Sequence, residues 1–314
     1  MRDEHVTWVV GSGGLLGKAV VRELNLLGRP FRTVSVPWSH PDEAAASLIQ
    51  TAAIIAAAAV PWRVMWCAGA AVVGATTEQL EAEQQSLSTF LEALGAATAD
   101  GHPGAVFLAS SAGGVHAGSS APPFTEHTAP RPISPYGDGK LASELLVREF
   151  ALRRGTPCLI GRIANLYGPG QDLTKAQGLV SQLCRAHLVR QPLSIYVSLD
   201  TARDYVFAAD AAKVAVAALD RTFDSPAGTV VVKLIASQQA TTVASLLGEL
   251  RRITRSRPKV VLGASPLSRF QTKDLRFRSV VWTELDALVT TGLPSGMFAT
   301  LQGVGASLRS PSRP

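Results

Sequence analysis

The chain has 314 residues, of which 46% are hydrophobic and 17% are charged. This balance excludes an intrinsically disordered protein, and the length suits one large α/β unit with a smaller lobe. The formal net charge of +6 is concentrated over residues 251–278, where Asp274 is the only acid among many bases. Because no nucleic-acid motif or interleaved aromatic residue accompanies these bases, they indicate a solvated helix face or an anionic small molecule, and we expect no nucleic-acid partner.

The N-terminal segment predicts a short buried strand, a glycine turn and an amphipathic helix that ends at Gly28. Charged residues at positions 2–4 lead directly into the apolar run VTWVV, which is not the order of a signal peptide. The three cysteines of the chain are odd in number and widely separated, which argues against a disulfide framework or a zinc cluster. We therefore expect a cytoplasmic protein without a bound metal.

The glycine run GSGGLLG separates this first strand from this first helix. Backbone without Cβ can approach a pyrophosphate closely, and a helix N-terminus favours its negative charge. The strand, turn and helix together therefore predict dinucleotide binding rather than a purely structural turn. The cofactor-binding residues predicted here are Gly11, Gly13, Gly14, Leu15, Leu16 and Gly17.

The second predicted strand, FRTVSV, should end beside the adenine ribose of such a cofactor. An acid at this point usually grips the ribose hydroxyls of NAD. The matching position is near Ser35, and no carboxylate follows until Asp42. Its absence removes repulsion against a 2′-phosphate, which Arg32 or His40 could assist. The sequence thus favours NADP(H) slightly over NAD(H), with NAD bound without this contact as the alternative.

The next segments continue the alternation of helices and strands. The alanine-rich run 44–60 is shorter than the roughly 20 residues that cross a bilayer, so we predict a packed helix and no membrane partner. The strand WRVMWCAGA brings Ala68 and Gly69 toward the cofactor, and a helix over 77–99 leads to the strand AVFLASS. This order predicts an α/β fold with a doubly wound parallel sheet.

The stretch SPYGDGK predicts the start of a helix, with Ser134 as N-cap and proline in the first turn. Residues four apart share one helix face, so Tyr136 and Lys140 should point the same way. The two glycines each cost roughly 1 kcal/mol in a helix interior, so the surrounding fold would have to hold this turn. Ser110 and Ser111, at the end of the preceding strand, should lie near the same edge of the sheet.

These side chains are suited to proton transfer. A free tyrosine has a pKa of about 10, and a downward shift of roughly three units corresponds to about 4 kcal/mol. A nearby ammonium favours the phenolate. Such a tyrosine can exchange a proton with a sugar hydroxyl while hydride moves between carbon and nicotinamide. We therefore predict catalytic roles for Tyr136, Lys140, Ser111 and Ser110, rather than an ordinary helix tyrosine.

Beyond the strand TPCLIGRIANLY the pattern loosens, from about Gly168. One further strand, TVVVKLI, one helix within TTVASLLGELRRITRSRP and a disordered tail, RSPSRP, are predicted. We predict a dinucleotide-binding domain over 1–168, with returning segments near 200–236, and a mainly substrate-binding α/β lobe over 169–314.

The motifs GSGGLLG, CAGAA, SSAGGVHAG, SPYGDGK, GRIANLYGPGQD and ARDYVFAADAA follow one another in an order that resembles the extended short-chain dehydrogenases/reductases. These are nucleotide-sugar epimerases, dehydratases and ketoreductases, and the resemblance covers nearly the whole chain. It implies a Rossmann-type sheet and a homodimer, with Tyr136 as acid/base and Lys140 on the nicotinamide ribose.

The resemblance also implies that Asn165 and Arg203 contact a sugar nucleotide, Arg203 through its phosphates. A guanidinium suits that role because it makes bidentate contacts with phosphate. The alternatives are that Asn165 only caps a turn and that Arg203 pairs with Asp204 or Asp210.

The chain departs from the family pattern in three places. Counted back from Val115, the usual catalytic Ser/Thr position falls on Ala112, so Ser111 serves only if the loop is arranged differently. His116 replaces a usual tyrosine, which we interpret as a substituted loop residue. The third strand with its adenine-binding aspartate is missing, and the alanine-rich helix takes its place.

Several reactions are compatible with this pattern. Gly113 and Gly114 stand where the 4,6-dehydratases have the Asp–Glu pair that eliminates water, so dehydration is disfavoured. Ketoreductases exchange a reduced cofactor at each turnover, whereas epimerases hold NAD tightly. The missing acid near Ser35 favours a 4-ketoreductase, and a 4-epimerase is almost level with it. A catalytically silent dinucleotide sensor is a lesser alternative, because Tyr136 and Lys140 are both present.

Overall fold

The computed structural model of the chain describes residues 5–69, 74–99, 101–174, 177–265 and 270–309. Its centre is a parallel sheet of six strands in the order β2-β1-β3-β4-β5-β9. The predicted doubly wound parallel sheet is therefore confirmed. The bounds of these strands are Val6–Val10 (β1), Phe31–Val34 (β2), Trp62–Trp66 (β3), Gly104–Ser111 (β4), Cys158–Ile163 (β5) and Val230–Ile235 (β9).

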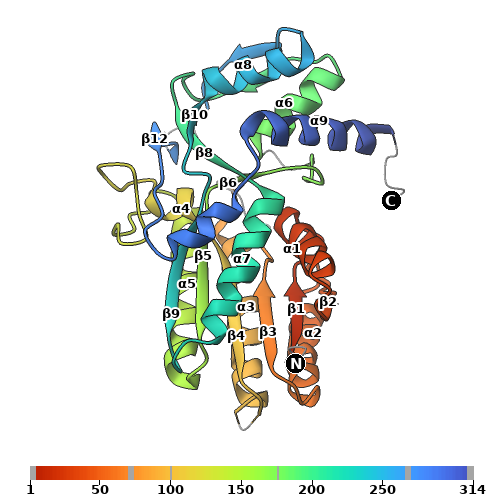
Figure 1. The fold of residues 1–314 in the computed structure, drawn as a ribbon, viewed down its shortest axis with the longest axis vertical. Coiled ribbons are helices and arrows are strands. Elements are labelled where there is room, and N and C mark those ends of the chain that lie inside the picture. Colours follow the sequence, from red (N-terminus) through yellow and green to blue (C-terminus); the bar gives the residue numbers. More distant parts are fainter. Residues whose placement is uncertain (1–4, 70–73, 100, 175–176, 266–269, 310–314) are drawn as a thin grey trace.

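Helices cover both faces of this sheet (Figure 1). On one face α1 packs against α7, and on the other α3 packs between α2 and α5. Each face has its own apolar cluster, so both sides of the strands are buried, as a parallel sheet requires. The bounds are Leu15–Leu26 (α1), Pro41–Ala57 (α2), Thr77–Ala97 (α3), Pro135–Arg154 (α5) and Ala208–Phe223 (α7).

The alanine-rich segment forms α2, as predicted. Its buried residues recur at helical spacing and face the sheet, and they are Ala44, Leu48, Thr51, Ala52 and Ile55. No helix within the described ranges is both long enough and apolar enough to cross a membrane.

Strand β2 forms one edge of the sheet. The chain leaves β2 through α2 and enters β3 on the other side of β1, so nothing in the described part of the chain pairs with the outer side of β2. The missing third strand predicted from the sequence is confirmed. As a result, β2 is the edge strand of this sheet among the described residues.

The smaller lobe is built around β8, which pairs with β6, β10 and β12, and around a second pair, β7 and β11. Helices α6, α8 and α9 pack over these strands around Tyr167, Leu246 and Met297. The strand bounds are Asn165–Tyr167 (β6), Leu193–Ile195 (β7), Ala202–Phe207 (β8), Ala240–Thr242 (β10), Val260–Leu262 (β11) and Asp274–Leu275 (β12). The helix bounds are Leu179–Leu188 (α6), Val243–Thr254 (α8) and Leu293–Arg309 (α9).

The sequence did not predict α9, because this segment contains proline and several glycines. The structure gives a reason for two of them: a Cβ on Gly296 would collide with the hydroxyl of Tyr167, and one on Gly303 would lie 2.5 Å from Pro169. Residues that usually weaken a helix thus allow this one to pack closely. The predicted tail RSPSRP begins at Arg309, and its remaining residues lie outside the described ranges.

A buried ionic cluster joins β9 to the C-terminal part of the chain. The Nζ of Lys233, which is fully buried, lies 2.5 Å from an oxygen of Asp286 in the 3₁₀ helix η2 (Thr283–Leu288). It also donates to Ser279 and lies 4.0 Å from Glu126. Since an isolated buried charge is very costly, the members of this cluster depend on one another.

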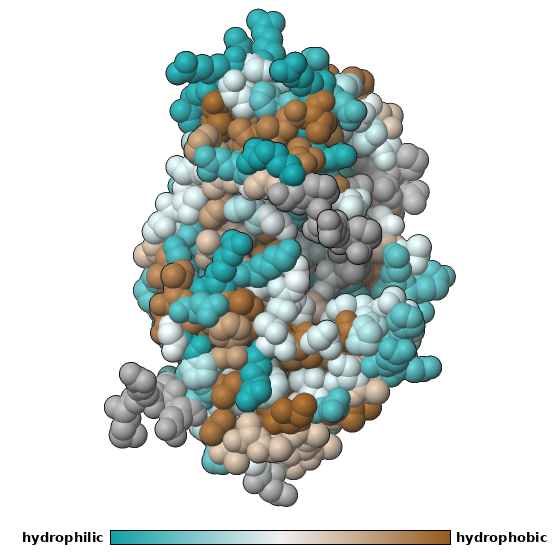
Figure 2. All heavy atoms as spheres, turned by 90° about the vertical axis from the view of Figure 1, so that its right-hand side faces the viewer, coloured by the Kyte–Doolittle hydropathy of each residue, from teal (hydrophilic) through white to brown (hydrophobic). Residues whose placement is uncertain are grey.

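The basic stretch at the end of α8 is exposed. The exposed side chains are those of Arg251, Arg252, Arg255, Arg257 and Lys259. Figure 2, which views the β2 side of the molecule, shows hydrophilic side chains at the tip of the upper lobe. Their exposure agrees with the interpretation of these bases as a solvated helix face.

Candidate cofactor and catalytic site

The turn between β1 and α1 has room only for glycine at two positions. Gly11 has a φ of +82°, and a Cβ there would lie 2.5 Å from the backbone nitrogen of Ala68; one on Gly17 would collide with the carbonyl of Gly11. At Gly13, by contrast, an added Cβ would meet nothing within 4 Å. The outer surface of the turn is therefore open, and α1 begins behind it without a side-chain cap. Its free N–H groups fit a pyrophosphate.

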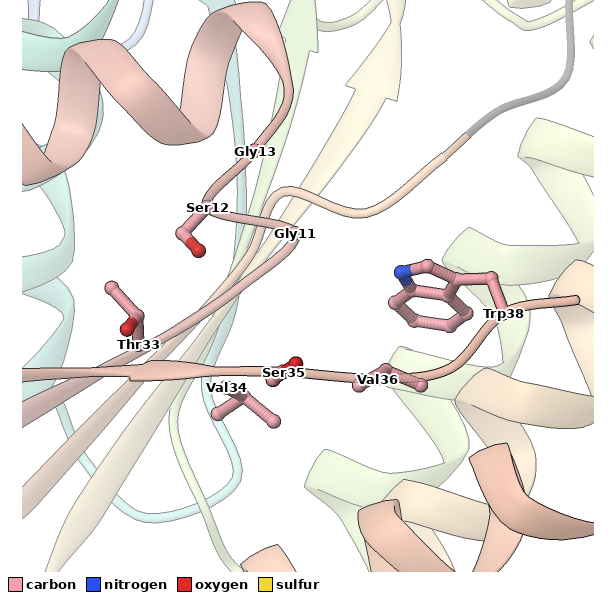
Figure 3. Close-up of a pocket in the computed structure, with 8 residues that line it drawn as sticks. All are labelled: Gly11, Ser12, Gly13, Thr33, Val34, Ser35, Val36 and Trp38. Carbon is pink, nitrogen blue, oxygen red and sulfur yellow. The ribbon is translucent and has the colours of Figure 1, made fainter. Parts of the chain in front are cut away.

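A hollow lies between this turn and the end of β2 (Figure 3). Ser35, the residue predicted to stand beside the adenine ribose, lines it, and none of the lining residues carries a carboxylate. The lining residues are Gly11, Ser12, Gly13, Thr33, Val34, Ser35, Val36 and Trp38. Three of the residues predicted to bind a cofactor, Gly11, Gly13 and Ser35, therefore border one hollow.

Helix α5 begins as predicted. It starts at Pro135, and the backbone N–H of Gly137 donates to the Ser134 hydroxyl at 3.2 Å. The Nζ of Lys140 lies 5.7 Å from the ring centre of Tyr136, so the two side chains share one face of the helix. Lys140 also lies 3.7 Å from a carboxylate oxygen of Glu83 on α3.

The two glycines in the first turn of α5 are explained by close packing. A Cβ on Gly137 would collide with the carbonyl of Gly114, and one on Gly139 would lie 3.1 Å from the side chain of Leu80. Contacts with the neighbouring helices α4 (Ala112–His116) and α3 thus hold a turn whose own helix propensity is low.

Only one of the two predicted serines borders the same glycine as the tyrosine. The Ser111 hydroxyl accepts a hydrogen bond from the N–H of Gly114 at 3.1 Å. A Cβ on Gly114 would lie 3.3 Å from that hydroxyl oxygen and 3.0 Å from the ring of Tyr136. Both side chains therefore border Gly114, whereas Ala112, where the family pattern has its hydroxyl, is fully buried in the core.

Ser110 belongs to a different environment. Its hydroxyl donates to a carboxylate oxygen of Glu144 at 2.7 Å, and Glu144 is fully buried. Arg162 donates to both oxygens of Glu144, at 3.0 and 2.7 Å. The charged pair on α5 and β5 was not recognised in the sequence, although an arginine inside the apolar strand CLIGRI was a signal that a buried partner exists.

His116 extends this buried network. Its Nε2 accepts a hydrogen bond from Arg162 at 3.2 Å, and its ring stacks on Phe124 with centroids 5.6 Å apart. Burial, followed by the charge of Arg162, lowers the pKa of His116 to about 4. The residue is therefore a neutral core histidine at the end of α4, and the interpretation of His116 as a loop residue was wrong, because its ring packs into the core beside Phe124 and Arg162.

The predicted substrate residues lie on the paired strands β6 and β8. The side-chain nitrogen of Asn165 donates to the carbonyl of Asp204 at 2.9 Å. Arg203 is 7% exposed and donates to the Ala202 carbonyl at 2.9 Å and to Gln271 Oε1 at 3.1 Å. Burial lowers the pKa of Arg203.

The alternative pairing of Arg203 with Asp204 or Asp210 is not found. Asp204 accepts from Ser237, and Asp210 accepts from Lys213 and from two backbone N–H groups. A second hollow adjoins the partners of Arg203, lined by Tyr196, Val197, Ser198, Thr201, Gln271 and Lys273. Across the described residues, then, no carboxylate hydrogen-bonds this buried guanidinium, although the charge of Asp274 acts on it.

Comparisons with known proteins agree with this geometry. The NAD dependent epimerase/dehydratase family matches the chain over residues 7–232. The chain is 39% identical to the dTDP-L-rhamnose 4-epimerase of Burkholderia thailandensis over 101 residues, which are 32% of this chain and 28% of that protein. It is 32% identical to the dTDP-4-dehydro-6-deoxyglucose reductase of Escherichia coli over 105 residues, 33% of each. The chain thus spans about a third of the length of these curated relatives. A longer match, at 29% identity over 67% of each chain, is to the UDP-glucose 4-epimerase of Azospirillum brasilense.

Solved structures with this fold are similar over almost their entire length. The UDP-glucose 4-epimerase of Thermotoga maritima, solved with UDP-glucose, has a TM-score of 0.79 at 22% identity and covers 96% of this chain and 99% of its own. The protein RMD of Pseudomonas aeruginosa, solved with NADPH, has a TM-score of 0.74 at 21% identity, with 96% and 99% covered. At these identities the likeness establishes the fold.

Proposed function

The chain belongs to the NAD-dependent epimerase/dehydratase family, and from that premise we propose that it reduces the 4-keto group of a nucleotide-linked sugar with a reduced nicotinamide cofactor. The observation that carries this proposal is the meeting of Ser111 and Tyr136 around Gly114, with Lys140 on the same face of α5 as Tyr136. A carbonyl reduction needs these three groups close to one another around the ketone.

In the proposed reaction Tyr136 donates its phenolic proton to the ketone oxygen. When bound, the nicotinamide supplies the hydride that adds to the carbonyl carbon of this ketone. The Ser111 hydroxyl donates a hydrogen bond to the same oxygen, which stabilises the charge that develops there. The position of the Lys140 ammonium beside Gly69, in the loop after β3, would allow it to hold the nicotinamide ribose.

The cofactor residues follow from the open turn and the hollow. The backbone of Gly11, Gly13, Gly14, Leu15, Leu16 and Gly17 would hold the pyrophosphate, and Ala68 closes the turn from β3. Ser35 would face the adenine ribose. Since the hollow has no carboxylate to repel a 2′-phosphate, we propose NADP(H) as slightly preferred over NAD(H).

The edge position of β2 favours reduction over epimerisation. A reductase must release its oxidised cofactor at each turnover, whereas an epimerase recycles a tightly held one. The hollow lies at the margin of the sheet, where no further strand encloses it among the described residues. This arrangement favours an exchangeable cofactor.

A nucleotide-sugar 4-epimerase remains the second candidate. It is supported by the epimerases among the curated relatives, and it uses the same three side chains. A silent dinucleotide sensor is the lesser alternative.

The substrate would extend from the catalytic residues to the smaller lobe. We propose that Arg203 binds the phosphates of the nucleotide and that Asn165 contacts the sugar nucleotide.

The exposed Leu145 and Leu152 lie seven residues apart on α5 and support a homodimer through helix packing. Three unpaired cysteines fit a reducing, cytoplasmic location.

A product panel tests the proposal. Purified protein is mixed with UDP- and dTDP-linked 4-keto sugars and either NADPH or NADH. Oxidation of the reduced cofactor that depends on the keto sugar is the expected result. Interconversion of two sugars without added cofactor would instead identify the epimerase, and tight cofactor binding without any turnover would identify the sensor.

A further inference from the structure

The hollow beside the glycine turn has one aromatic lining residue, Trp38. It lies in the loop between β2 and α2, and its indole projects back toward Gly11 and Ser12 (Figure 3). The residue is 47% exposed. A large aromatic side chain that is half-exposed at the wall of a polar turn is well placed to cover a flat ligand.

Trp38 is anchored on its inner side. Its ring contacts Trp66 of β3 nearly at a right angle, with centroids 6.3 Å apart and an interplanar angle of 82°. Trp66 is buried and in turn packs on Phe90 of α3 at 5.3 Å. The backbone N–H of Trp38 donates to the carbonyl of Val36 at 3.0 Å. The indole is therefore in contact with the core through Trp66.

The position of Trp38 relative to the proposed cofactor follows from the places of the glycine turn and the end of β2. If the pyrophosphate lies on the turn at Gly11–Gly14, the adenosine half extends toward the end of β2, where Ser35 faces the ribose. In the ranges described, no strand lies beyond β2 to form a wall for the base. Trp38 comes three residues after Ser35 and lines the same hollow.

We propose that Trp38 provides the surface on which the adenine ring of the dinucleotide stacks. The proposal rests on the proposed function, because it requires a dinucleotide on the glycine turn. Stacking needs no hydrogen-bonding partner for the base, so it replaces a carboxylate that the missing strand would have carried. Adenine recognition in this chain then depends on an aromatic face supplied by the loop after β2.

Three variants separate stacking from packing. Trp38→Phe keeps an aromatic face, Trp38→Leu keeps an apolar contact with Trp66 but no flat ring, and Ile49→Ala changes an exposed residue of α2 that does not line the hollow. Affinity for NADPH and for NADH is measured by calorimetry, and thermal melting verifies that each variant is folded. We expect Trp38→Leu to bind roughly tenfold more weakly or worse, Trp38→Phe to stay within about threefold of the wild type, and Ile49→Ala to be unchanged.

Fluorescence gives a second readout without turnover. ADP-ribose, which contains the adenine but no nicotinamide, should quench tryptophan emission in the wild-type protein. In Trp38→Phe most of this quenching should disappear, although calorimetry still detects binding.

The outcomes distinguish this inference from the proposed function. If the wild-type protein binds neither dinucleotide, both are overturned. If the wild type binds and Trp38→Leu binds equally well, only the role of Trp38 is overturned. It is also overturned if Trp38→Phe is as weak as Trp38→Leu, because packing rather than an aromatic face would then be responsible.

Discussion

The hydroxyl of Ser110 is hydrogen-bonded to the buried carboxylate of Glu144 at 2.7 Å, whereas the hydroxyl of the next residue, Ser111, borders Gly114, as does the ring of Tyr136. Two adjacent serines at the end of one strand therefore have different environments. Successive side chains of a strand point to opposite faces, which accounts for the difference. The pair offers a matched test of catalytic and structural roles.

Ser111→Ala should lower kcat by about tenfold to a hundredfold, because a hydrogen-bond donor to the ketone oxygen is lost. Ser110→Ala should leave kcat nearly unchanged but lower the free energy of unfolding by about 1–3 kcal/mol, because Glu144 loses a buried partner. Steady-state kinetics and urea denaturation measure the two effects. The reverse pattern would assign the catalytic hydroxyl to Ser110.

Tyr136→Phe should lower turnover by at least about a hundredfold, as expected when a positioned proton donor is removed. Cofactor affinity should stay close to the wild-type value, since the glycine turn is untouched. Single-turnover kinetics and calorimetry with NADPH measure these quantities. Wild-type turnover in this variant would remove Tyr136 from the mechanism.

Arg203→Ala should raise the KM for the nucleotide sugar by about tenfold or more, because a charge-assisted contact with phosphate is lost. Arg252→Ala serves as a control, since this arginine is exposed on α8 and pairs with Glu249. An unchanged KM in the folded fraction of Arg203→Ala would show that the guanidinium only connects β8 to its neighbouring segments.

His116 should make stability depend on pH. Its pKa is about 4 in the folded protein and about 6.5 in a free side chain, so the unfolded chain binds more protons between these values. The free energy of unfolding should therefore fall as the pH drops from 6.5 to 4, by at most about 1.4 kcal/mol per pH unit from this group. Asp204 acts in the opposite direction, since burial raises its pKa to about 6.

The contribution of His116 can be isolated with His116→Gln, which can still accept a hydrogen bond from Arg162 but does not titrate. Urea denaturation at several pH values between 4 and 7 should give a flatter dependence for the variant than for the wild type. Identical slopes would mean that His116 titrates alike in both states.

Lys233→Met should destabilise the fold by about 3–5 kcal/mol, because it leaves the carboxylates of Glu126 and Asp286 without their buried cation. Affinity for NADPH in the folded protein should not change, since Lys233 lies outside the cofactor hollow. Denaturation and calorimetry provide the two measurements. A loss of stability below about 1 kcal/mol would show that the cluster is not cooperative.

Much of the architecture was predictable because its signals are local. The glycine turn, the alternation of strands and helices and the N-cap at Ser134 depend on residues close together in the chain. The shared face of Tyr136 and Lys140 follows from helix geometry alone. Even the missing third strand was visible, because the alanine-rich segment has the period and length of a helix.

Other features depend on contacts between segments far apart in the chain. The sequence could not show that Arg162 pairs with Glu144, that His116 is buried beside them, or that Gly296 allows α9 to approach Tyr167. It also could not show which serine lies beside Tyr136. The sequence by itself determined the fold class and the candidate residues, because period and spacing are properties of neighbouring residues. Only the tertiary structure decided the direction and partner of each side chain, because these depend on which distant segments pack together.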